Sequence, residues 1–149
     1  AMVHVSTAFS NCDIPEIEEK IYPQEIDPDG LIDCLNWMSN DFLEKVTPAL
    51  LGSKPNTYVL TKALAESLIQ KAKGLPVAIV RPSIVTAAWM EPHPGWVDSN
   101  SGIHALVLGG ARGVIRTFPG DPKNQADFIP VDIPINMMIV AAWHTARTF

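Results

Sequence analysis

Basic residues, cysteines and long apolar runs are all scarce in this sequence of 149 residues. Its 11 lysines and arginines are outnumbered by 16 aspartates and glutamates, which gives a formal net charge of -5. A nucleic-acid surface needs clustered positive charge to displace phosphate counterions, so we expect no nucleic-acid partner. The longest apolar run, Met137 to Trp143, is far shorter than the ~20 residues that a membrane-spanning helix needs.

The two cysteines, Cys12 and Cys34, allow one disulfide at most, and we expect both to be reduced thiols in a cytosol-like compartment. No paired cysteine or histidine spacing indicates a zinc site, and the four histidines are scattered, so we expect no metal. No charged segment followed by an apolar stretch indicates a signal peptide near the first residue.

Apolar residues, in contrast, make up 47% of the chain, which is enough for the core of one ordinary domain. Met2 to Thr7 is a β-branched run, and because this strand begins at residue 2 we expect the protein to extend upstream. Pro76 to Val85 has a nearly continuous apolar centre, typical of a strand buried on both faces of a parallel sheet.

Helical patterns fill much of the rest of the chain. Asp27 is a predicted N-cap with Pro28 in the first turn, and Gly74 and Pro76 are predicted to stop a later helix. The predicted helices are Ile14 to Ile21, Asp27 to Gly52, Tyr58 to Lys73 and about Ile133 to Ala146. Strand, helical excursion, helix and strand form the βαβ pattern of a doubly wound, Rossmann-like α/β fold, of which residues 1–149 are the expected C-terminal part.

Tyr58 and Lys62 lie four residues apart at the start of a predicted helix, so they share one helical face. Ligands of open α/β sheets bind at the carboxyl ends of the strands, where Ser6 and Thr7 follow the first strand. We therefore expect Tyr58, Lys62 and the hydroxyl of Thr7 or Ser6 to converge at this edge.

This combination suits hydride addition to a carbonyl. A phenol stabilises the charge that develops on oxygen and then protonates it, while a neighbouring ammonium favours the phenolate form. A free tyrosine, with a pKa near 10, is a slow participant near neutral pH. The alternatives at this point are that the Tyr-x-x-x-Lys pair lies on an ordinary solvated helix face and that Ser6 and Thr7 simply end a strand.

Five segments stand in a characteristic order and spacing: "STAFSN" (Ser6 to Asn11), "PNTYVLTKALAE" (Pro55 to Glu66), "VAIVRPSIV" (Val77 to Val85), "WMEPHPGWVD" (Trp89 to Asp98) and "DFIPVDIPINMMIVAAW" (Asp127 to Trp143). Together they resemble the fatty acyl-CoA reductase family, an extended branch of the short-chain dehydrogenases and reductases. The resemblance covers essentially the whole chain, and the "EPxPGW" loop and the "PNTYxxTKALAE" context are specific to these reductases.

The resemblance implies NADPH-dependent reduction of a long-chain fatty acyl-CoA to a primary fatty alcohol. It makes Tyr58 the proton donor, Lys62 the residue that holds the nicotinamide ribose and tunes the tyrosine, and Thr7 the hydroxyl partner, with Ser6 its less favoured neighbour. A further implied group, Pro82, Ser83 and Ile84, meets the nicotinamide end of the cofactor through backbone groups. A peroxisomal or endoplasmic-reticulum location, and membrane association through segments outside this chain, are implied in the same way.

Two features depart from the family pattern. Phe9 stands where relatives often carry tyrosine, and the Gly-rich turn that seats the cofactor pyrophosphate is absent, so we expect a partial NAD(P)-binding reductase domain. Two other functions stay open. One is another extended short-chain reductase, of sugar-nucleotide or hydroxysteroid type, and the other is a non-catalytic remnant that acts as an interaction module.

Overall fold

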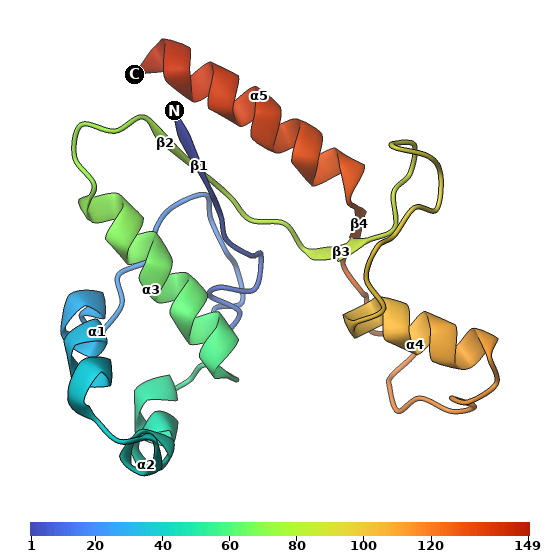
Figure 1. The fold of residues 1–149 in the computed structure, drawn as a ribbon, viewed down its shortest axis with the longest axis horizontal. Helices are drawn as coiled ribbons and strands as arrows, with labels where there is room; N and C mark the ends of the chain where they lie inside the picture. The colour runs from blue at the N-terminus through green and yellow to red at the C-terminus, as the bar shows by residue number, and fades with distance from the viewer. The chain divides into compact units, whose positions relative to one another are not determined.

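The computed structural model describes residues 1–149 and divides them into two compact units. One unit holds Ala1–Arg81 and Val140–Phe149, and the other holds Pro82–Ile139. The predicted α/β class with parallel strands is confirmed (Figure 1). The elements, in chain order, are β1 (Met2–Val5), α1 (Pro28–Trp37), α2 (Asn40–Leu51), α3 (Thr57–Lys71), β2 (Val77–Val80), β3 (Ile84–Thr86), α4 (Gly102–Ala111), β4 (Phe128–Pro130) and α5 (Asp132–Thr148).

In the first unit, β1 and β2 form a parallel pair, with Met2 opposite Val77 and Val5 opposite Val80. The ladder continues past β1, because the Ser6 amide donates to the Val80 carbonyl at 2.8 Å. Only Val80 of β2 is fully buried, so the prediction of a strand buried on both faces is wrong for most of its length. The physical reason is that β2 pairs with a single strand and lacks the covering layers of a complete sheet.

Helix α3 supplies most of the core of this unit. Its residues Val59, Leu60, Ala63 and Leu64 are buried, and the Asn56 side chain caps the helix by accepting from the Val59 amide at 3.0 Å. Helices α1 and α2 both contact α3.

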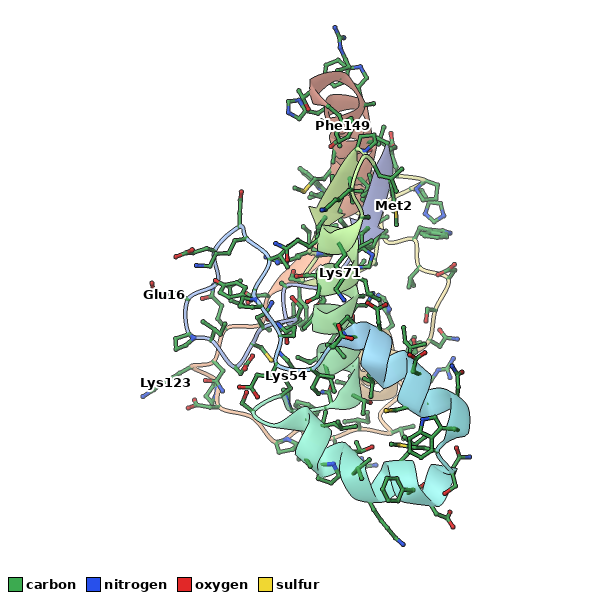
Figure 2. The ribbon with its side chains drawn as sticks, turned by 90° about the vertical axis from the view of Figure 1, so that its left-hand side faces the viewer. Met2, Glu16, Lys54, Lys71, Lys123 and Phe149 are labelled. Atoms are coloured by element: carbon green, nitrogen blue, oxygen red, sulfur yellow. The ribbon has the colours of Figure 1, made fainter.

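The predicted cap of α1 is confirmed, because the Asp27 carboxylate accepts from the Gly30 amide at 2.9 Å and Pro28 is in the first turn. Lys71, which is labelled in Figure 2, is at the end of α3 and also donates to Asp27 and to Asp29 at 2.9 and 2.6 Å. These ion pairs hold the start of α1 beside the end of α3.

Two predicted helices need correction. The helix expected from Asp27 to Gly52 is two helices, because Ser39 adopts an extended backbone and caps α2 through the Phe42 amide. Ile14 to Ile21 contains bends and irregular backbone and no helix. Its carbonyls at Glu18 and Lys20 accept hydrogen bonds from Arg81, so tertiary contacts replace the helical ladder there.

The second unit is built on a parallel pair, β3 and β4, with Ile84 opposite Phe128 and Thr86 opposite Pro130. The strand predicted from Pro76 to Val85 is therefore divided, because its backbone leaves the first ladder after Val80 and joins another from Ile84. The predicted closing helix is confirmed as α5, whereas α4 was not predicted. None of the helices has the length and apolar content required to cross a bilayer.

Candidate functional site

Three ionisable side chains, Tyr58, Lys62 and Glu66, follow one another at steps of four along α3. This spacing places them on one face of the helix, about one turn apart. Their exposure falls along the helix, since Tyr58 is 54% exposed, Lys62 is half-buried and Glu66 is 1% exposed. The face thus runs from an accessible phenol to a buried carboxylate.

Lys62 links this face to the end of β1. Its Nζ donates to the Val5 carbonyl oxygen at 2.9 Å and lies 5.9 Å from the centroid of the Tyr58 ring. The latter distance is within the range in which a cation interacts with an aromatic ring. The ammonium group is therefore held beside the phenol by a backbone hydrogen bond.

Ser6 and Thr7 follow β1 directly and are each 4% exposed. Their hydroxyls have different hydrogen-bond partners. The Ser6 Oγ donates to Glu66 Oε1 at 2.5 Å, whereas the Thr7 Oγ1 accepts from the Phe9 amide at 3.2 Å and donates to no protein acceptor. The Thr7 hydroxyl proton is therefore free to bind a ligand oxygen, and the Ser6 proton is not.

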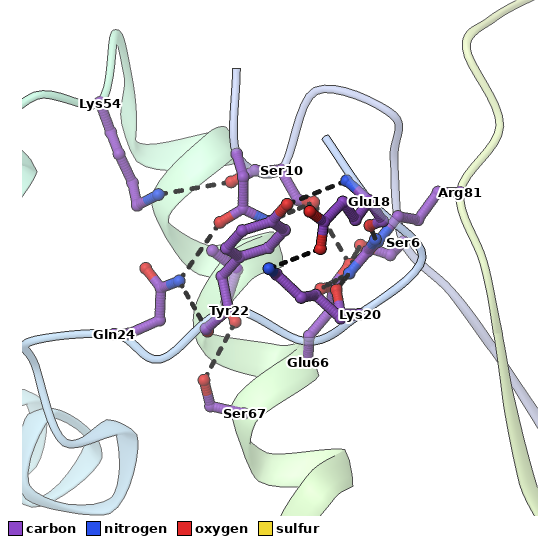
Figure 3. Close-up of polar contacts among 12 residues, drawn as sticks. Ser6, Ser10, Glu18, Lys20, Tyr22, Gln24, Lys54, Glu66, Ser67 and Arg81 are labelled. Carbon is purple, nitrogen blue, oxygen red and sulfur yellow. Dashed lines mark hydrogen bonds and ion pairs between the residues drawn. The ribbon is translucent and has the colours of Figure 1, made fainter. Parts of the chain in front are cut away.

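The buried Glu66 and the partly buried Arg81 form an ion pair beside the Ser6 hydroxyl (Figure 3). Arg81 Nε donates to Glu66 Oε1 at 2.9 Å and Nη2 donates to Oε2 at 2.7 Å. Burial on its own raises the pKa of Glu66, but the hydrogen bonds from Arg81 and Ser6 and the Arg81 charge outweigh it and hold that pKa below its usual value. Glu66 is thus a carboxylate acceptor at neutral pH.

His4, on β1, has a buried Nε2 atom without a hydrogen-bond partner. Burial and the nearby Lys62 charge lower the pKa of His4, so the ring is neutral at neutral pH. Cys12 and Cys34 are both free, and no group of three His, Cys, Asp or Glu side chains is placed to hold a metal ion.

Comparison with protein families gives a match to the NAD-binding family described as male sterility protein, over residues 1–138. The match covers most of the chain. The chain belongs to the male sterility protein family.

Several curated relatives of this male sterility protein family member are fatty acyl-CoA reductases. Mouse fatty acyl-CoA reductase 2 is 47% identical over 98% of the chain, and fatty acyl-CoA reductase 1 of Xenopus laevis and of human are each 46% identical over 96% of it. The chain spans 28% of the length of each of these relatives. The resemblance inferred from the sequence is confirmed, and the family makes the cofactor a nicotinamide dinucleotide.

Within this family framework, the structure brings part of the predicted site together. It joins Lys62 to the end of β1 and joins Ser6 to α3, and it places Tyr58 one turn before Lys62. The predicted cofactor residues Pro82, Ser83 and Ile84 follow Arg81 along the chain and belong to the second unit.

The sequence reasoning missed two residues of this site, Glu66 and Arg81. The signal for Glu66 was present, because a single charged residue among "ALAESL" continues the four-residue spacing of Tyr58 and Lys62. For Arg81, the sequence alone could not show that its guanidinium contacts Glu66 on α3.

Proposed function

We propose that this chain is the catalytic part of a reductase that converts a long-chain fatty acyl-CoA to a primary fatty alcohol with NADPH. The observation that carries the proposal is that Lys62 lies beside the Tyr58 ring and donates to Val5, two residues before Thr7. The accessible Tyr58 phenol lies beside Lys62, which is fixed to the end of β1. The buried Thr7 hydroxyl, just after that strand, donates no hydrogen bond within the protein. The family membership and the names of the relatives support the substrate class.

Each of these side chains has a role in the reduction of a carbonyl. Tyr58 donates a proton to the oxygen on which charge develops, and Lys62 stabilises the phenolate that remains. Thr7 donates a second hydrogen bond to the same oxygen. A bound nicotinamide dinucleotide would supply hydride to the thioester carbonyl, with release of coenzyme A, and a second dinucleotide would supply hydride to the resulting aldehyde.

Between the two candidate hydroxyls, the contacts favour Thr7. The Ser6 hydroxyl already donates a hydrogen bond to Glu66, and breaking that bond leaves a buried carboxylate short of one donor. Thr7 accepts from the Phe9 amide, which leaves its own proton available. We therefore assign the oxyanion contact to Thr7, and Ser6 serves the buried network.

We assign the binding of the cofactor to two parts of the chain. Lys62 offers an ammonium group to the nicotinamide ribose hydroxyls, and the resemblance assigns backbone contacts with the nicotinamide end to Pro82, Ser83 and Ile84.

We also propose that the full-length protein works at the peroxisomal or endoplasmic-reticulum membrane. Imaging of the tagged full-length protein with markers of both compartments tests this location, and a diffuse cytosolic signal would contradict it.

The activity is tested with purified full-length protein, a long-chain acyl-CoA, and either NADPH or NADH. We expect NADPH oxidation to accompany free coenzyme A and a primary alcohol, with two NADPH consumed per acyl chain, and slower turnover with NADH. Free thiol is measured colorimetrically and the alcohol by mass spectrometry. Absence of thioester-dependent NADPH oxidation would overturn the proposal and favour the non-catalytic interaction module.

A further inference from the structure

We infer that Glu66 is a positioning residue that fixes the Thr7 hydroxyl relative to Tyr58, acting through Ser6. The inference rests on the proposed function, because it assigns a role to a residue that touches neither substrate nor cofactor in that reaction. Glu66 is 1% exposed and lies two helical turns after Tyr58 on the same face of α3.

The first observation is the number of donors that converge on this one carboxylate. Oε1 accepts from Ser6 Oγ at 2.5 Å, from Ser10 Oγ at 3.3 Å and from Arg81 Nε at 2.9 Å, and Oε2 accepts from Arg81 Nη2 at 2.7 Å. Figure 3 shows Ser6, Ser10 and Arg81 grouped around Glu66. The segment that carries Thr7 is therefore attached to α3 on both sides of Thr7.

The second observation is that the backbone before Thr7 is fixed independently. The Val5 carbonyl accepts from Lys62, and the Ser6 amide donates to Val80. These contacts fix the backbone as far as Ser6, and the hydrogen bonds from Ser6 and Ser10 to Glu66 hold the segment that contains Thr7. Helix α3 thus carries the phenol and also holds the segment that presents the second hydrogen-bond donor.

A purely stabilising role explains this arrangement less well. Burying a charge costs desolvation energy that the attraction of its partner does little more than offset, so the ion pair of the buried Glu66 with the partly buried Arg81 is weak evidence of stability. A carboxylate with several fixed donors does, however, hold those donors in one geometry. Proton donors that are displaced by about 1 Å can lower a reaction rate by roughly 100-fold.

A double-mutant cycle in the full-length protein separates the two roles. The variants are Glu66→Gln, Thr7→Ala and the double variant, and kcat and KM for a long-chain acyl-CoA are measured for each. An amide has one acceptor oxygen in place of two, so it cannot hold both Ser6 and the Arg81 fork. We expect Glu66→Gln to lower kcat roughly 10- to 100-fold with little change in KM.

In the Thr7→Ala background, the same Glu66→Gln change should lower kcat by no more than about twofold, because the group it positions is gone. An equal loss of kcat in both backgrounds overturns the inference. Asp132→Asn, which alters a buried carboxylate of the second unit, is the matched control and should lower kcat by the same factor in both backgrounds.

If Glu66→Gln fails to fold, Ser6→Ala replaces it in the cycle, because it deletes only the hydroxyl that Glu66 holds. The same non-additive result is expected, and additive losses overturn the inference. Failure of the proposed function has a different signature. In that case the wild type does not reduce the thioester, or Thr7→Ala alone retains wild-type kcat.

Discussion

Lys62 donates a hydrogen bond from Nζ to the backbone carbonyl oxygen of Val5, 2.9 Å away, and so joins the second turn of α3 to the last residue of β1. The same ammonium lies 5.9 Å from the centroid of the Tyr58 ring. Lys62 therefore contacts both the backbone of Val5, which holds the fold, and Tyr58, which is proposed to take part in the reaction. Changes at Lys62 should affect rate and cofactor affinity more than stability.

We predict that Lys62→Met in the full-length protein lowers kcat roughly 100-fold and also raises KM for NADPH. Loss of the hydrogen bond to Val5 should cost about 1 kcal/mol of stability. Lys62→Arg should not restore the rate, since a planar guanidinium does not replace a compact ammonium. Lys73→Met, at an exposed lysine just beyond α3, is the control. Recovery of the rate by arginine to within about twofold would contradict the assigned role.

Asp132 fixes the loop that begins at Trp89. Its carboxylate accepts from the amides of Trp89 at 3.0 Å, Met90 at 2.8 Å and Glu91 at 3.3 Å. We predict that Asp132→Asn speeds amide hydrogen exchange at these three residues, because an amide side chain has one acceptor oxygen for three donors. Asp98→Asn, at an exposed aspartate that accepts no hydrogen bond, should leave the exchange unchanged. If these amides exchange as slowly in the Asp132→Asn protein as in the wild type, other contacts hold the loop.

The second unit contains a cavity of about 350 Å³ lined mainly by apolar side chains, among them Ile84, Trp96, Val97 and Ile103. Its size falls in the usual range of small-molecule sites. We predict that Trp96 contacts the acyl chain, so that Trp96→Ala raises KM more for long acyl-CoA substrates than for short ones. Trp89→Ala, at a side chain that is 64% exposed, is the comparison. An equal loss at every chain length in Trp96→Ala would mean that Trp96 only packs the loop.

Acid should weaken the contacts of Glu66. Its pKa in the folded protein is held below the usual value, so as pH falls Glu66 is protonated in the unfolded chain at a higher pH than in the folded protein. The stability that Glu66 contributes is thus complete above its unfolded-state pKa of 4.5 and is lost as pH falls through the lower folded value. We predict that, between about pH 6 and pH 3, the melting temperature falls more steeply for the wild type than for Glu66→Gln. Parallel curves would contradict this, and Glu44→Gln, at an exposed glutamate, should match the wild type.

The elements that sequence alone predicted well are those whose signals are local. The helix around Tyr58 and Lys62 lies between Asn56, which caps it, and Gly74, which adopts a positive φ of 76° after it. The two apolar runs predict the strands β1 and β2, and the βαβ pattern predicts that they run parallel, as they do. The α/β class could be recognised for the same reason.

The errors arose where distant contacts decide the backbone. The segment from Ile14 to Ile21 has helical periodicity. Arg81, some sixty residues away, instead donates hydrogen bonds to the backbone carbonyls of Glu18 and Lys20. The sequence also left Ser6 and Thr7 as alternatives. Their hydroxyls are alike in type, and only the burial of Glu66 beside Ser6 distinguishes them.

The most direct test of this account is the steady-state rate of NADPH oxidation by full-length Tyr58→Phe protein with a long-chain acyl-CoA. The Tyr58 phenol makes no hydrogen bond within the protein and the residue is 54% exposed, so loss of its hydroxyl should leave the melting temperature nearly unchanged. Tyr22→Phe is the matched control, because it deletes the chain's other phenol, which accepts from the Glu18 amide. We predict that Tyr58→Phe lowers turnover roughly 100-fold or more, the usual effect of a lost general acid, whereas Tyr22→Phe does not. A Tyr58→Phe protein that reduces the thioester at the wild-type rate would contradict the account.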